Sequence, residues 1–188
     1  MKRLGIYAVL LLATASICIR SEVQASTSYV VAKSGASVAS GRDTSNKISI
    51  DNGVTYFNAY VLDPLPAPLQ GLYPTIAGTK WISGDPDGLY GGPGNLTRVQ
   101  ILFNMPLSSL PSEFKIRLHA DNYAYVYLNG VSIGGQPNCE CYGNYDDPPT
   151  VFTTTNTSLF HQTNNLLQID FYNWTQYTAI DYKASVTY

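Results

Sequence analysis

Two pairs of aspartates in turn-rich segments have residue types and spacings that could do chemistry. Asp85 and Asp87 lie two positions apart in a Gly- and Pro-rich stretch, and Asp146 and Asp147 are adjacent and precede Pro148. Two carboxylates in one cleft could hydrolyse a glycosidic bond, but carboxylates in irregular backbone more often hold calcium or cap turns. We predict a structural Ca2+ site, with Asp85 and Asp87 as the first candidate ligands and Asp146 and Asp147 as the second. The alternative is that these residues are solvated carboxylates in turns.

His119 and Asp121 form the second candidate pair, because residues two apart on a strand share one face. A His-Asp pair could orient the base that activates a nucleophile, yet we expect no partner serine for it. The spacing favours a solvent-facing pair that meets Asp170 or Asp181 across neighbouring strands. We therefore predict that the chain is not an enzyme.

Cys139 and Cys141 are the only cysteines after residue 25. In an oxidising compartment they could form a local disulfide, although cysteines two apart make a small, strained ring. We predict this local disulfide, with separate thiols or inter-chain bridges as the alternatives. A zinc site would need two further ligands that this segment does not supply.

The first 25 residues are typical of a secretory signal peptide. Lys2 and Arg3 precede an apolar run over residues 6–19, and Val23-Gln24-Ala25 is a small-residue cleavage site. We predict cleavage after Ala25, with a retained anchor as the alternative. The protein would then be secreted or periplasmic, and residues 26–188 would form one domain.

Composition narrows the partners of this domain. The whole chain has a formal net charge of −2, and loss of residues 1–25, with three basic residues and one acidic residue, changes it to −4. A mildly acidic chain argues against nucleic acid and anionic membranes. Only 13% of residues are charged whereas 15 are tyrosines, and tyrosine suits both β-strands and binding surfaces.

Short alternating runs broken by Gly, Pro, Asn and Asp predict an all-β chain. The clearest stretch, Leu118 to Gly130, consists of two runs that meet at Asp121-Asn122 and are read as a hairpin, and the second run stops at an Asn-Gly turn. Prolines between residues 64 and 74 predict a long surface loop. We expect an antiparallel β-sandwich with strands at 29–33, 47–50, 54–62, 99–105, 116–120, 123–128, 132–134, 150–154, 167–171 and 180–186, and one helical turn within 156–163.

Three stretches carry a family resemblance: Trp81-Ile82 before a Gly/Pro-rich loop, Ala120-Asp121-Asn122-Tyr123 with Leu128-Asn129-Gly130, and Asn165-Leu166-Leu167 to Trp174 before a closing strand. Together they resemble the galactose-binding-like jelly roll, and in particular the small exported bacterial domains found in PEP-CTERM proteins. Relatives often end in a sorting tail, whereas this chain ends at Tyr188 within a predicted strand, so the expectation is free secretion.

The resemblance implies a ligand at the loop end of the sandwich. Planar rings stack on the faces of sugars, and amides form hydrogen bonds with sugar hydroxyls. Trp81 is not included among the ligand contacts, because we expect it to lie in the core. The predicted ligand-binding residues are Tyr90, Tyr142, Asn144, Tyr145, Trp174 and Tyr177. The predicted function is non-catalytic recognition of extracellular or cell-surface carbohydrate, and the alternative is a structural or self-assembling protein of an extracellular matrix or surface.

Overall fold

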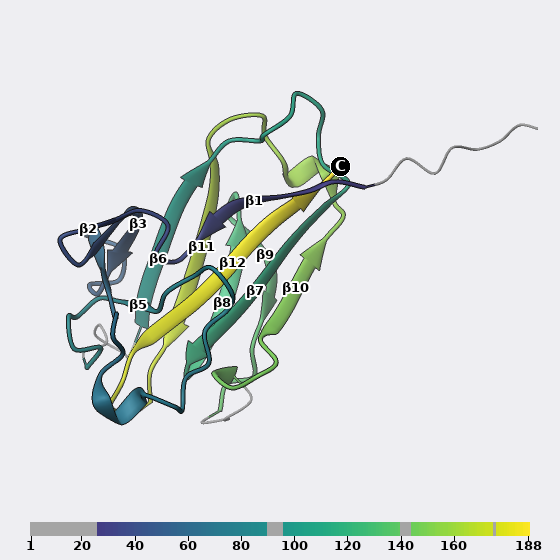
Figure 1. Ribbon diagram of the computed structural model, residues 1–188. Helices are drawn as coiled ribbons and strands as arrows, with labels where there is room; N and C mark the ends of the chain where they lie inside the picture. The colour runs from purple at the N-terminus through teal and green to yellow at the C-terminus, as the bar shows by residue number, and fades with distance from the viewer. Residues whose placement is uncertain (1–25, 90–95, 140–143, 175) are drawn as a thin grey trace, which may run out of the picture.

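The computed structural model describes residues 26–89, 96–139, 144–174 and 176–188, and it confirms the predicted antiparallel β-sandwich (Figure 1). The layer nearer the viewer, called the front sheet, has the order β10 (Thr150–Thr154), β7 (Glu113–Asp121), β12 (Ala179–Thr187) and β1 (Ser28–Lys33). The layer behind it, called the back sheet, has the order β3 (Arg42–Ser49), β6 (Leu96–Phe103), β11 (Asn165–Tyr172), β8 (Tyr123–Leu128) and β9 (Val131–Gly135).

Short strands join the two layers at one side. β4 (Phe57–Val61) pairs with β3, and β5 (Ile82–Ser83) pairs with both β4 and β12, while β2 (Val38–Ala39) pairs with β3. From β6 onward the chain alternates between layers: β6 lies in the back sheet, β7 in front, β8 and β9 behind, β10 in front, β11 behind and β12 in front. This alternation defines a jelly roll.

The core lies between the layers, where the apolar residues of the alternating strands meet. Ile116 and Leu118 of β7 and Phe171 of β11 are fully buried in one cluster with Val126 of β8. Each such side chain contributes about 1.5–3 kcal/mol through burial. The alternation in the sequence therefore reports correctly which residues of these strands face the core.

Two of the predicted turns are confirmed, and one predicted hairpin is wrong. Asn129 and Gly130, both at positive φ, join β8 to β9, and the turn at Asn52 joins β3 to β4. The Asp121-Asn122 corner, by contrast, ends β7 in the front sheet and begins β8 in the back sheet, so these strands face each other across the core. A run with period two looks the same in a hairpin and in a change of sheet.

The Pro-rich segment is less superficial than predicted. It contains a 3-10 turn, η1 (Ala67–Leu69), and it buries Leu69, Tyr73 and Trp81 against Leu62 and Ala179. This second, smaller core lies beneath one end of the sandwich. Because the segment packs against the end of the front sheet, through His119 and Asp121 of β7 and Ala179 of β12, it can position side chains there.

The other strands are present near their predicted positions, but β3 begins at Arg42 rather than at residue 47, and β2 and β5 were not predicted. The predicted helical turn is present as η4 (Thr157–Leu159), where the Asn156 side chain accepts a hydrogen bond from the Ser158 amide. In the described part of the chain, no helix has the length and apolar character needed to cross a bilayer.

Candidate functional site

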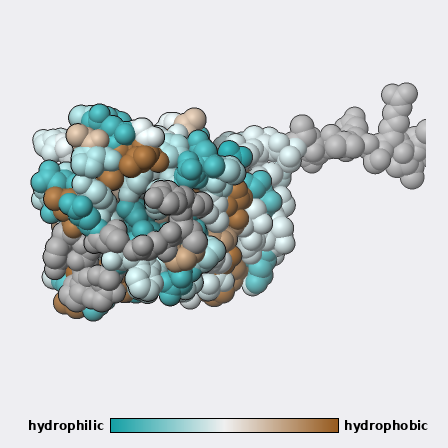
Figure 2. All heavy atoms as spheres, turned by 90° about the horizontal axis from the view of Figure 1, so that it is seen from below, coloured by the Kyte–Doolittle hydropathy of each residue, from teal (hydrophilic) through white to brown (hydrophobic). Residues whose placement is uncertain are grey.

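A pocket of about 450 Å³ opens at the end of the sandwich that holds the Asp121-Asn122 corner and η1, here called the loop end. Figure 2 views the molecule from below and shows hydrophobic residues there as separate areas among hydrophilic ones. The pocket has the size of a small-ligand site. Its lining combines aromatic, acidic and aliphatic side chains: Tyr73, Tyr145, Tyr177, Asp121, Asn122, Asp146, Pro68, Leu69, Gly71 and Leu72.

Four aromatic rings lead from this pocket into the interior. The Tyr145 ring lies 5.3 Å from that of Tyr73, and the Tyr73 ring lies 4.6 Å from that of Trp81. Trp81 then stacks on His119 with 5.9 Å between centroids and 12° between planes. Trp81 is 1% exposed, which confirms its predicted core position. Only the outer rings face the pocket, and the inner ones fix their positions.

The pocket floor is held by a bond between Tyr73 and Asp121. The buried Tyr73 hydroxyl donates a hydrogen bond to Asp121 Oδ2. Burial, followed by the negative charge of Asp121, raises the pKa of Tyr73 far above its usual range. Tyr73 therefore stays a neutral donor, and the Asp121 carboxylate is oriented by it.

Asn122 ties together the segments that surround the pocket. Its side-chain oxygen accepts a bond of 2.6 Å from the Trp174 amide, and its carbonyl accepts one of 2.8 Å from Asn144 Nδ2. Asn144 also donates to the Pro137 carbonyl at 3.0 Å and is 3% exposed. Of the predicted ligand residues, Asn144 is thus placed as a brace between loops, and its contact with a ligand remains a prediction.

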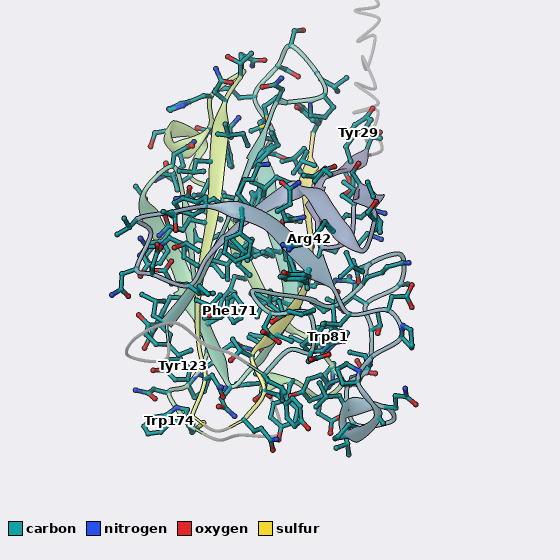
Figure 3. All side chains as sticks on the ribbon, turned by 90° about the vertical axis from the view of Figure 1, so that its left-hand side faces the viewer. Tyr29, Arg42, Trp81, Tyr123, Phe171 and Trp174 are labelled. Atoms are coloured by element: carbon teal, nitrogen blue, oxygen red, sulfur yellow. The ribbon has the colours of Figure 1, made fainter. Side chains whose placement is uncertain are left out.

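Trp174 lies at the same end but outside the pocket lining. Its side chain is 52% exposed, and Figure 3 shows it at the loop end beyond Tyr123, well away from Trp81. The backbone bond to Asn122 holds its position while the indole remains open to solvent. The structure therefore brings Tyr145 and Tyr177 together, with Trp174 at the margin.

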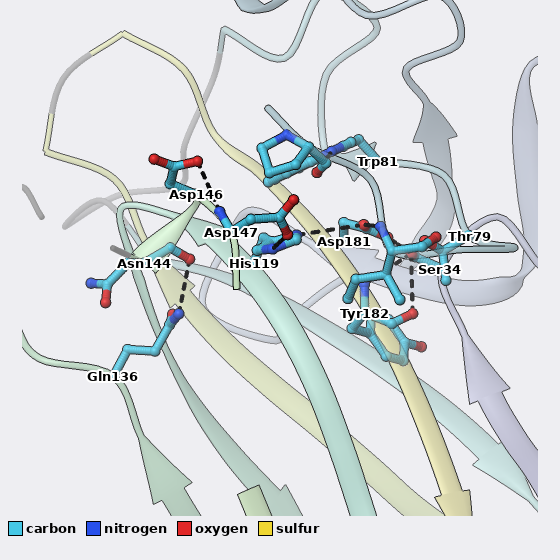
Figure 4. Close-up of polar contacts among 12 residues, drawn as sticks. Ser34, Thr79, Trp81, His119, Gln136, Asn144, Asp146, Asp147, Asp181 and Tyr182 are labelled. Carbon is cyan, nitrogen blue, oxygen red and sulfur yellow. Dashed lines mark hydrogen bonds and ion pairs between the residues drawn. The ribbon is translucent and has the colours of Figure 1, made fainter. Parts of the chain in front are cut away.

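His119 differs from its prediction, because it is buried rather than solvent-facing. It lies opposite Asp181 in the β7–β12 register, as one of the two predicted pairings requires, with 3.7 Å between His119 Nδ1 and Asp181 Oδ2 (Figure 4). Asp147 Oδ1 lies 3.5 Å from Nε2, and neither ring nitrogen makes a hydrogen bond. The Pro-rich segment covers this end of the front sheet, so the exposed face that the alternation predicts becomes interior.

The acidic pairs predicted to hold calcium are arranged as turns. Asp85 Oδ1 accepts bonds from the amides of Asp87 and Leu89, and Asp146 Oδ1 accepts from the Asp147 amide. Among the described residues, no three acidic, histidine or cysteine side chains are grouped as metal ligands. Asp146 lines the pocket, whereas Asp85 and Asp87 do not.

Three of the predicted site residues, Tyr90, Tyr142 and Cys141, lie outside the described residues. Cys139 is disulfide-bonded, and its pairing with Cys141 stays a prediction.

A second aromatic cluster covers the outer face of the back sheet. The rings of Tyr123 and Tyr172 stack with 4.9 Å between centroids and 5° between planes, and Tyr125 meets both edge to face. Beside them Arg98 forms a bidentate ion pair with Asp170 at 2.7 Å for both bonds. The stacked and edge-to-face contacts between these rings stabilise the sheet face.

One serine motif in this sheet has no catalytic setting. Residues 130–134 read Gly-Val-Ser-Ile-Gly and match the pattern of a nucleophile elbow. That elbow requires a turn between a strand and a helix, whereas Ser132 is an exposed residue of β9 immediately after a hairpin turn. Ser132 and His119 belong to opposite layers, so the motif supplies no nucleophile for the His-Asp pair.

Sequence reasoning missed the two residues that build the pocket floor. Tyr73 lies in a segment read as a surface loop, and Asp121 was considered only as a partner of His119. A usable signal was present, since Leu69, Tyr73 and Trp81 are large apolar or aromatic residues in a stretch otherwise rich in turn formers. Such residues in a long loop indicate that it is packed against the body of the protein.

The fold and the site together define a jelly-roll β-sandwich with an aromatic, acidic pocket at its loop end. No protein-family model matches the chain, and no curated protein sequence matches it. The likeness to PEP-CTERM-associated domains therefore stays a prediction.

Solved structures with a similar arrangement of strands exist at very low sequence identity. A family 35 carbohydrate binding module from Clostridium thermocellum has 11% identity and a TM-score of 0.42 over 85% of this chain and 97% of its own. A cyclase from Fischerella sp. TAU has 11% identity and a TM-score of 0.48 over 86% and 98%. The xylan-binding module CBM15 has 10% identity and a TM-score of 0.38 over 87% and 97%. These scores are too low to transfer a family or a ligand.

Proposed function

We propose that this chain is a carbohydrate-binding domain whose ligand occupies the loop-end pocket. The observation that carries this proposal is the convergence of Tyr73, Tyr145 and Tyr177 with Asp121 and Asp146 around one cavity of about 450 Å³. A sugar presents apolar C–H faces and a ring of hydroxyls. Tyrosine rings pack on the former, and carboxylates accept hydrogen bonds from the latter.

The electrostatics of the pocket favour a neutral, hydroxyl-bearing ligand. Its charged side chains are both acidic, so an anionic ligand would be repelled. Since Tyr73 is fixed against Asp121 and Tyr145 is packed on Tyr73, the site loses little conformational freedom when a ligand binds. Trp174, exposed at the margin, extends the aromatic surface for a second sugar unit.

The proposal includes export of the protein and a non-catalytic role for the domain. The signal-like residues 1–25 support secretion to a compartment where polysaccharides are found, and the disulfide at Cys139 is consistent with an oxidising environment. Asp121 is engaged by Tyr73, which suits a fixed acceptor better than a group that must exchange protons. The proposed calcium ion would be structural.

A glycan-array screen of the purified chain, followed by titration calorimetry on the strongest neutral glycan, tests the pocket. We expect Tyr145→Ala and Tyr177→Ala each to weaken binding about tenfold, which corresponds to ~1.4 kcal/mol. Tyr127→Ala is the matched control, because Tyr127 is a half-buried tyrosine on the outer face of the back sheet. The titration is repeated with calcium and with a chelator.

Three results would contradict the proposal. Equal losses in Tyr127→Ala and in the pocket variants would place the ligand elsewhere, and the absence of any glycan signal would remove the ligand class. Release of reducing sugar from a bound glycan would show that the domain is catalytic.

The alternative function, self-assembly at a surface, has one observation in its favour. β9 is the edge strand of the back sheet, and Val131 at its start, opposite Leu128, is 47% exposed. An exposed strand edge can pair with another chain. Concentration-dependent association in a sizing experiment, abolished by Val131→Lys, would favour this function over sugar binding.

A further inference from the structure

Three basic residues stand in one row across the outer face of the front sheet. The register places Lys33 of β1 opposite Lys183 of β12, and Lys183 opposite Arg117 of β7. Their neighbours Ala32, Ala184 and Ile116 are buried in the core, so the three basic side chains all point outward. Lys115 follows on the same face of β7, two residues from Arg117.

Such a row lowers stability, because like charges directly opposite each other across strands repel. The charge is also poorly neutralised. Arg117 lies between Lys183 and Val151 in the register and is exposed, and Lys183 Nζ donates to the Ala77 carbonyl at 3.1 Å. Within the described residues, neither Arg117 nor Lys183 forms an ion pair.

Three carboxylates on this face still leave a net positive charge. Glu113 lies 3.0 Å from Lys115, and Asp181 is fully buried and accepts bonds from the Ile76 amide and the Ser34 hydroxyl. Asp121 at the end of β7 is the third acid on this face and accepts a hydrogen bond from Tyr73. Four basic residues against three acids give a charge of +1 on one face of a chain whose total is −2. The distribution of charge is therefore uneven.

The row borders a preformed groove of about 340 Å³. Lys115, Arg117 and Lys183 line it together with the hydroxyl residues Ser28, Ser185 and Thr187. Ile76 and Ala77 form one wall of the groove. The Ile76 amide bonds to Asp181 Oδ2 at 2.7 Å, so buried contacts fix this wall.

We propose that this groove binds the sulfate or carboxylate groups of an acidic polysaccharide. Guanidinium and ammonium groups recognise such anions by charge-assisted hydrogen bonds, and the serine and threonine hydroxyls can bond the sugar hydroxyls between them. The groove lies on the open sheet face and the tyrosine pocket lies at the loop end, and their charges have opposite sign. The inference is therefore independent of the proposed neutral-sugar site.

The shape and lining of the groove favour a polysaccharide over other polyanions. No aromatic side chain lines it, so it lacks a platform on which nucleic-acid bases could stack. Anionic membranes are recognised by denser clusters, about four to eight basic residues at the surface, whereas three line this groove.

The test is affinity electrophoresis of the full chain against heparin, polygalacturonate and neutral dextran, from about 50 to about 300 mM NaCl, across which the screening length shortens about twofold. We expect binding to one or both acidic polymers that weakens with salt, and none to dextran. The double variant Arg117→Gln/Lys183→Gln should lose at least about tenfold in affinity, while its melting temperature stays unchanged or rises because the repulsion is relieved.

Matched controls separate this site from general charge and from the tyrosine pocket. Lys47→Gln/Lys80→Gln removes the same amount of charge from outside the groove, where Lys47 bonds to Asn58 and Lys80 to Asp63. This double variant should change the affinity less than about twofold. Tyr145→Ala should leave heparin binding intact. Equal loss in both double variants, salt-independent binding, or equal binding of duplex DNA or phosphatidylserine vesicles through Arg117 would overturn the proposal.

Discussion

The hydroxyl of Tyr73 bonds to the carboxylate of Asp121, and this contact joins two segments that are 48 residues apart in the chain. Tyr73 follows η1 in the Pro-rich segment, and Asp121 ends β7 at the corner where the chain changes sheets. A buried contact between a side loop and a sheet corner fixes both. The shape of the loop-end pocket therefore depends on it.

Tyr73→Phe should destabilise the protein by about 1–3 kcal/mol, because it removes a buried hydrogen bond to a charged group. The ring remains, so its contacts with Trp81 and Tyr145 are kept. Urea unfolding measures the loss. Tyr127→Phe, at a half-buried position on the back sheet, should change stability by less than about 0.5 kcal/mol; an equal loss there would show that the Tyr73 hydroxyl has no special role.

Stability should also fall at alkaline pH. Burial raises the pKa of both Tyr73 and Tyr182 above the ordinary value of 10.0, with the charges of Asp121 and Asp43 adding to the effect. The unfolded state ionises near that value while the folded state keeps its protons, so the stability is fully present below pH 10 and is lost as the pH rises further. Urea midpoints measured from about pH 8 to about pH 11 should fall, and should fall less steeply in Tyr73→Phe.

The strands could be predicted from the sequence because strict alternation carries information about burial. Thr150 to Thr154 is a strand as predicted, and the outward tyrosines of β8 alternate with inward Ala124, Val126 and Leu128. The sheet change at Asp121-Asn122 could not be predicted, since pairing partners of these strands lie far away in the chain. Long-range pairing leaves no local pattern.

The site was only partly predictable, for a related reason. Tyr145 and Tyr177, predicted as ligand contacts because aromatic residues in loops suit binding, line the pocket. Tyr73 and the burial of His119 depend on where the segment 63–80 packs, and prolines in a sequence indicate only that a segment is not a central strand. The basic row was invisible because Lys33, Arg117 and Lys183 come together only through strand register.

Asp51 should support the fold in mild acid. Bonds from the Thr55 hydroxyl and amide, and then from Ser49, lower its pKa from 3.8 to about 2. Because the folded pKa is the lower one, this stability is present above pH 3.8 and is lost as the pH falls toward 2. Asp51→Asn should flatten the decline in melting temperature over that range, whereas Asp87→Asn, in an exposed turn, should follow the parent; identical curves for all three would exclude Asp51 as a contributor.

Gly134 should be the least replaceable residue of β9. A Cβ there would lie 2.2 Å from Cδ1 of Phe152 on β10 of the opposite sheet, so alanine would force a packed ring to move. Overpacking of this kind costs about 1–3 kcal/mol. Gly135→Ala would meet the Tyr125 ring at 2.2 Å, but this ring lies on the outer face and can turn toward solvent, so its cost should be smaller. Urea unfolding measures the stability of both variants, with Ser132→Ala, an exposed change on the same strand, as the control. A larger loss of stability in Gly135→Ala than in Gly134→Ala would contradict this order.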